Sequence, residues 1–201
     1  ARSLAQKGES LTEDDRSTIT QLIQQAIREG RATVTLNPGR SGNWEILARI
    51  YQAIMPFAQG ADNFAIQSFN QSIALDPTNP NLRIALGGVY YALGRYDEAI
   101  RVFELAVLSK PALANAHYNL AVAYREKGEI EKAIEQMKLV LSLVEKDSSD
   151  YELAKTELEN LEKKRPATGE ASENLTPPTS AEEPVISPPL TLPEDSTPPA
   201  P

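Results

Sequence analysis

The chain has 201 residues, 41% of them hydrophobic, and a formal charge of −8. It contains no cysteine, which excludes a disulfide scaffold and thiol catalysis, and no apolar run approaches the roughly 18 residues that a membrane helix needs. Six acidic residues and no lysine or arginine lie in residues 166–201. The first 165 residues therefore carry a charge of only −2, too balanced for a surface that binds nucleic acid or anionic membranes.

Residues 1–39 are predicted to form a degenerate, partial helical repeat. Thr12 and Asp15 have the spacing of a capping box, which marks the start of a helix. Apolar residues then recur at helical spacing and make one broad stripe: Ile19, Leu22, Ile23, Ala26 and Ile27. The preceding segment ARSLAQ is too short to cover this stripe. Either further repeats precede Ala1, or another molecule covers this end.

The middle of the chain repeats itself at a fixed period. Residues 80–113 and 114–147 align at a shift of 34 residues, and residues 40–79 join them when about five residues near MPFAQ are treated as an insertion. Size and polarity persist at eight positions, which pair Leu86, Gly87, Tyr90, Gly94, Tyr96, Ala99, Phe103 and Ala106 with Leu120, Ala121, Tyr124, Gly128, Ile130, Ala133, Met137 and Val140. The alternative is an ordinary helical bundle with accidental periodicity.

Each period has the signals of two helices that pack closely. The apolar residues lie three and four positions apart, which places them on one helical stripe. The small residues Gly87 and Ala99 allow close approach of the two backbones, and Gly94 suits the turn between the helices. Asn79 and Pro80 form an N-cap and first helical residue, and Pro111 ends the hairpin.

The pattern of Leu-Gly, Tyr, Gly, Ala, Phe, Ala and Pro from Pro80 to Pro111 resembles that of the tetratricopeptide repeat family. The resemblance covers residues 40–147 as three repeats, and the last one departs from the pattern at Gln136-Met137, Val140 and Glu145. It implies an all-α fold, a right-handed superhelical solenoid of helix-turn-helix hairpins.

Residues 148–165 are predicted to form a helix that caps the C-terminal end of the solenoid. Ser149 is the predicted N-cap and Glu152 completes a capping box. Pro166 ends the helix. Its apolar stripe comprises Tyr151, Ala154, Leu158 and Leu161.

Residues 166–201 form an acidic tail rich in Pro, Ser and Thr. Ten prolines and few large apolar residues predict a disordered or polyproline-like linker. The alternative is a short extended anchor, because Val185, Ile186, Leu190 and Leu192 lie close together. The Ser/Thr-Pro composition also makes the tail a candidate for O-linked glycosylation.

The sequence does not predict a catalytic, cofactor or metal site. His117, the only histidine, corresponds to Trp44 of an earlier repeat and is expected to pack against the partner helix. A lone histidine without cysteines or a nearby acidic pair makes neither a zinc site nor a catalytic triad. Glu129, Glu131 and Glu135 are expected on a solvated helix face. The chain is therefore not expected to be an enzyme.

The family resemblance implies that the first helix of each repeat lines a groove that binds a protein or peptide. Two tyrosines, aliphatic residues and two arginines there fit an extended peptide. Some members of the family hold a C-terminal carboxylate of the peptide with lysines, but the predicted groove of this chain contains no lysine. The predicted groove comprises Glu45, Arg49, Gln52, Asn81, Ile84, Gly88, Tyr91, Asn115, Tyr118, Val122 and Arg125.

Two functional hypotheses follow. The first is a non-catalytic interaction scaffold that self-assembles through its open end and tail, because an end-to-end contact can propagate as a filament. The second is the extracytoplasmic domain of a larger membrane protein, because LNPGRSGNW through LDPTNP to the tail resembles the C-terminal repeat regions of bacterial O-antigen ligases and polymerases. An extracytoplasmic or cell-surface location is therefore expected, with no membrane insertion by this chain.

Overall fold

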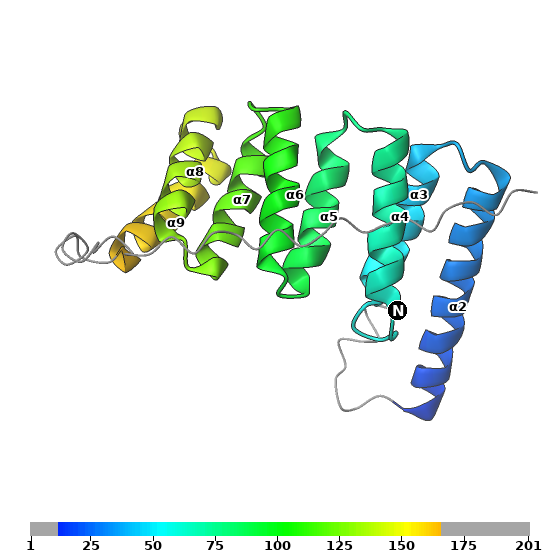
Figure 1. The fold of residues 1–201 in the computed structure, drawn as a ribbon. Coiled ribbons are helices and arrows are strands. Elements are labelled where there is room, and N and C mark those ends of the chain that lie inside the picture. Colours follow the sequence, from blue (N-terminus) through cyan, green and yellow to red (C-terminus); the bar gives the residue numbers. More distant parts are fainter. Residues whose placement is uncertain (1–11, 166–201) are drawn as a thin grey trace, which may run out of the picture. The chain divides into compact units, whose positions relative to one another are not determined.

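The computed structural model describes residues 12–165, which form eight helices and no strand. Figure 1 shows the helices side by side in chain order. The all-α fold of helical hairpins is confirmed. The segment ARSLAQ and the tail at 166–201 lie outside the described residues, as does the side chain of Asp15. The helices are α2 (Glu13–Leu36), α3 (Ser41–Ile54), α4 (Ala61–Leu75), α5 (Pro80–Ala92), α6 (Tyr96–Ser109), α7 (Ala114–Lys127), α8 (Ile130–Leu143) and α9 (Ser149–Lys164).

The helices pack as hairpins, and each hairpin packs on the next. Within hairpins α3 packs on α4, α5 on α6 and α7 on α8. Between hairpins the second helix packs on the next first helix, as α4 does on α5 and α6 on α7. We keep 40–79, 80–113 and 114–147 as the proposed repeats, and each contains one such hairpin.

The buried side chains recur at the repeat period. Phe69, Phe103 and Met137 occupy equivalent positions, and each is at most 1% exposed. In the second hairpin Phe103 lies directly against Gly87, where a Cβ atom would stand 2.4 Å from the Cε1 atom of its ring. Neighbouring Gly88, in contrast, faces open space, so close packing explains only the first of the two glycines.

Local signals set the helix limits as the sequence predicts. Gly94 has φ 70°, a left-handed conformation that favours glycine, between α5 and α6. The side chain of Asn79 accepts a hydrogen bond from the Asn81 backbone N–H at 3.1 Å and caps α5, whose first residue is Pro80.

One side chain in each first helix bonds back to the proline that ends the preceding repeat. The indole Nε1 of Trp44 donates to the Pro38 carbonyl at 2.8 Å, and a guanidinium nitrogen of Arg83 donates to the Pro77 carbonyl at 2.5 Å. His117, only 5% exposed, has its Nε2 2.8 Å from the Pro111 carbonyl. The packing role expected for His117 is confirmed, and this recurring bond fixes the turn between repeats.

The helix α9 covers the C-terminal hairpin, with Ala154 and Leu161 buried against it. The predicted N-cap was wrong by one residue. Ser148 has the extended backbone of a cap, and its hydroxyl accepts from the Tyr151 N–H at 3.1 Å, whereas Ser149 is already helical. Two adjacent serines offer the same cap chemistry, so the sequence alone could not choose between them.

The N-terminal helix α2 runs unbroken for 24 residues, whereas α3 has 14. Gly30 in α2 allows α3 to come close, because a Cβ there would lie 2.8 Å from the Cδ1 of Ile50. The N-terminal turns of α2 extend past the neighbouring helices, as Figure 1 shows.

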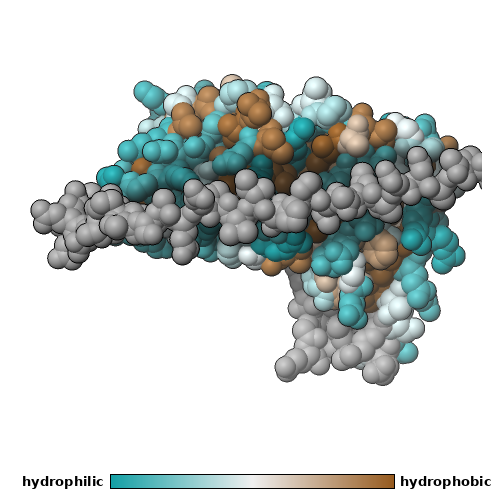
Figure 2. Space-filling view, viewed as in Figure 1, coloured by the Kyte–Doolittle hydropathy of each residue, from teal (hydrophilic) through white to brown (hydrophobic). Residues whose placement is uncertain are grey.

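The second helices also expose leucines, among them Leu105, Leu108 and Leu139. Figure 2 shows hydrophobic atoms interspersed with hydrophilic ones on the visible face. Leu108 on α6 is 76% exposed. Isolated leucines of this kind are ordinary surface features and indicate no binding site by themselves.

Candidate interaction surface

The predicted groove residues all lie on the first helices of the three hairpins. Glu45, Arg49 and Gln52 belong to α3, Asn81, Ile84, Gly88 and Tyr91 to α5, and Asn115, Tyr118, Val122 and Arg125 to α7. The structure brings the α5 and α7 sets together, because these two helices pack on each other, whereas α3 and α5 make no comparable contact. That these residues form one peptide groove stays a prediction.

Three side chains form what we call the inner patch: Ile84, Tyr91 and Tyr118. All three are half-buried and pack against the same core cluster. The Tyr91 ring lies 5.6 Å from the Tyr96 ring in a tilted arrangement, which fixes its orientation. Burial, with Glu126 nearby, raises the pKa of Tyr91, so its hydroxyl stays protonated. Asn81 and Asn115 are exposed on the first turns of the same helices.

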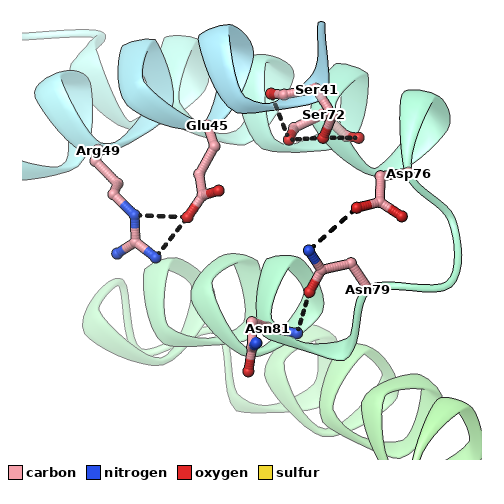
Figure 3. A network of polar contacts seen from close by, with 7 residues as sticks. All are labelled: Ser41, Glu45, Arg49, Ser72, Asp76, Asn79 and Asn81. Carbon is pink, nitrogen blue, oxygen red and sulfur yellow. Dashed lines mark hydrogen bonds and ion pairs between the residues drawn. The ribbon is translucent and has the colours of Figure 1, made fainter.

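Both arginines of the predicted groove already have carboxylate partners. In Figure 3, Arg49 and Glu45 project from α3 toward α5 and bond to each other at 2.8 and 2.9 Å. The Arg49 side chain is 55% exposed, so this pair contributes little stability but offsets the charge.

Arg125 is held more firmly, by Glu126 on its own helix at 2.7 Å and by Glu157 on α9 at 3.0 Å. Burial acts to lower the pKa of Arg125, but the hydrogen bonds to Glu126 and Glu157 outweigh it and raise the pKa. Arg125 therefore joins α7 to the capping helix. Glu157 was not identified from the sequence, because an ion pair between two helices depends on how the helices pack.

The acidic residues of the α8 region also serve structure. Lys127 and Lys132 lie 2.7 and 2.6 Å from carboxylate oxygens of Glu129, and their hydrogen bonds hold the pKa of Glu129 below its ordinary value. Arg165 bonds to Glu131 at 2.8 Å. Glu135 is exposed, as expected of a solvated face.

A recess, which we call the α2 groove, lies between α2, α3 and the inserted residues near MPFAQ, with a volume of about 1080 Å³. Arg49 and Gln52 line it, so two of the predicted residues face this groove. The sequence analysis found the α2 stripe but not Phe57 of the insertion. The lining includes Ile19, Leu22, Ile23, Ala26, Ile50, Ala53, Phe57 and Leu93.

Within residues 12–165, no three His, Asp or Glu side chains cluster in a way that could hold a metal ion. None of the described helices is long and apolar enough to cross a membrane. What these residues offer are surfaces of half-buried aromatic and aliphatic groups.

Comparison with known proteins identifies these hairpins. Two tetratricopeptide repeat models match, one over residues 57–118 and one over 114–147. The small glutamine-rich tetratricopeptide repeat-containing protein 2 of Saccharomyces cerevisiae is 31% identical over 110 residues, which are 51% of this chain and 32% of that protein. The matched region spans between 7% and 32% of the length of five curated relatives.

Solved structures show the same fold. A thermophilic tetratricopeptide repeat protein of Thermus thermophilus superimposes with a TM-score of 0.59 at 21% identity, over 72% of this chain and 75% of that one. The first repeat domain of Spaghetti (RPAP3), bound to the HSP90 peptide SRMEEVD, gives a TM-score of 0.52 at 22% identity, over 62% and 92%. Over residues 57–147 the chain belongs to the tetratricopeptide repeat family.

Proposed function

We propose that this chain is a non-catalytic interaction scaffold whose inner patch binds an extended peptide. The observation that carries the proposal is the inner patch itself, because half-buried tyrosines beside an aliphatic side chain are the kind of surface that anchors a peptide. Asn81 and Asn115, exposed on the same two helices, can hydrogen-bond a peptide backbone.

The charges near the inner patch favour apolar over acidic peptides. Arg49 and Arg125 are both paired with glutamates, so a peptide carboxylate would have to displace a bond that already exists. The HSP90 peptide bound by the Spaghetti domain carries several acidic residues. We expect this chain to bind such an acidic peptide weakly and to prefer large apolar side chains.

Selection from a phage-displayed random peptide library tests this proposal. A selected peptide, made with a fluorophore, should bind the full chain, and Tyr91→Ala or Tyr118→Ala should raise its Kd roughly tenfold or more. The measurement is fluorescence anisotropy, with circular dichroism to show that each variant is folded.

The matched control is Leu108→Ala, which removes an exposed apolar side chain from α6 and should leave the Kd unchanged. Binding that depends on Leu108 but on neither tyrosine would contradict the proposal. A library that yields no binding peptide would contradict it as well.

Self-assembly is a second proposed function, favoured by the N-terminal part of α2. Leu22 is 41% exposed there, within a stripe that the described residues leave partly open. Static light scattering over a range of concentrations would detect it, and a concentration-independent monomer would exclude it. Three predictions still rest on the sequence alone. They are a filament built with the help of the tail, glycosylation of that tail, and an extracytoplasmic place in a bacterial membrane protein.

A further inference from the structure

The α2 groove is apolar and open where the equivalent part of the other hairpins is covered. Ile50 corresponds to Val89 in α5 and Ala123 in α7, which are both fully buried. Ile50 is only partly buried and lines the groove. Opposite it, Phe57 of the insertion is 56% exposed. Within residues 12–165, the groove therefore has the apolar surface of a hairpin interface that no described helix completes.

One wall of this groove is an amphipathic helix whose apolar stripe is only partly covered by the described residues, since Leu22 is 41% exposed. Ile19, Leu22, Ile23 and Ala26 lie on one stripe of α2 and line the groove. Residues 17–27 contain no charged side chain. Two copies of this segment can therefore come together without bringing like charges into contact.

We propose that the α2 groove binds α2 of a second copy of this chain, in a two-fold symmetric, antiparallel pair. This inference rests on the proposed self-assembly and narrows it to one contact. An antiparallel register centred between positions 22 and 23 places each Ile19 opposite Ala26 of the second copy, so a large residue meets a small one. A parallel register would instead set Ile19 against Ile19 and Ala26 against Ala26.

Two features favour a second copy over a different partner. The hairpins of this chain already join antiparallel helices, so the pair extends a packing mode that the fold uses. The groove and the helix that fills it are also the same surface, which makes the contact self-complementary. Such a contact closes as a dimer and uses up both stripes, so it does not propagate into a filament.

Sedimentation velocity on the full chain from about 1 to 500 µM tests the pair, because a small helix interface should associate in the micromolar range. We expect a monomer–dimer equilibrium whose Kd rises at least about tenfold in Leu22→Arg. The control Leu108→Arg changes an exposed leucine on α6 and should leave the dimer intact. Peptide binding at the inner patch should be unchanged in both variants.

Single cysteines in this cysteine-free chain test the direction of the helices. Leu22→Cys places the two thiols near the symmetry axis, where they should form a disulfide on oxidation. Ala26→Cys, on the same stripe, places them about 10 Å apart along the antiparallel helices, so it should not cross-link. Cross-linking of both variants would indicate a parallel pair and overturn the proposal.

The outcomes separate this inference from the broader functions. A monomer at every concentration rejects both the pair and self-assembly. Association that Leu22→Arg does not weaken, or a mass that grows beyond the dimer, rejects the pair and keeps self-assembly. The peptide-binding proposal stands or falls separately, by the effects of Tyr91→Ala and Tyr118→Ala.

Discussion

Replacing Gly87 with alanine should destabilise the fold by about 1–3 kcal/mol, whereas the same change at Gly88 should stabilise it by up to about 1 kcal/mol. A Cβ at Gly87 would stand 2.4 Å from the ring of Phe103, which is 1% exposed and enclosed on all sides. Alanine is the better helix former by about 1 kcal/mol, but this gain is smaller than the cost of that overlap. A Cβ at Gly88 would meet only open space, so the higher helix propensity of alanine stabilises the fold there.

Urea unfolding of both variants measures this difference in sign. The double variant Gly87→Ala with Phe103→Leu should be less destabilised than the sum of its two single changes, because the smaller side chain relieves the overlap. Equal effects at Gly87 and Gly88 would show that helix propensity alone decides and that the two helices do not meet at Gly87.

The second large effect is expected at the capping helix. Leu161→Ala should destabilise the C-terminal hairpin by about 2–4 kcal/mol, since it removes a side chain that is 1% exposed in the last core cluster. In a stacked array such a loss acts first on the neighbouring repeat, so amide hydrogen exchange should rise in α8 and α9 before α3 and α4.

Leu153→Ala on the same helix is the matched control. Leu153 is 51% exposed, and its loss should change the free energy of unfolding by no more than about 0.5 kcal/mol. If the two substitutions cost the same, α9 would not cover the solenoid in the way described.

The repeat pattern predicted most of the fold because its signals are local and agree with one another. Gly94 indicated a turn and Asn79 before Pro80 indicated a helix start, and the structure has both. Contacts between residues distant in sequence could not be predicted in this way. Helix α2 continues through Gly30 because Ile50 and Leu47 of α3 pack there, and nothing in the segment itself indicates that contact.

The candidate surface was predictable in its residues but not in its connections. Periodicity placed Tyr91 and Tyr118 on the first helices of two neighbouring hairpins, where the structure has them. It could not show that Arg125 is held by Glu157 of α9, since ion pairs between helices depend on the angle at which they pack. The insertion that carries Phe57 was visible as extra length, but its place beside α2 was not.

Peptide binding at the inner patch is tested most directly by mapping a library-selected peptide on the isotope-labelled chain by NMR. We expect the largest chemical-shift changes on titration at Ile84, Tyr91 and Tyr118, with small changes at Leu105 and Leu139 on the second helices. Changes centred on those leucines, or none at the inner patch, would contradict it.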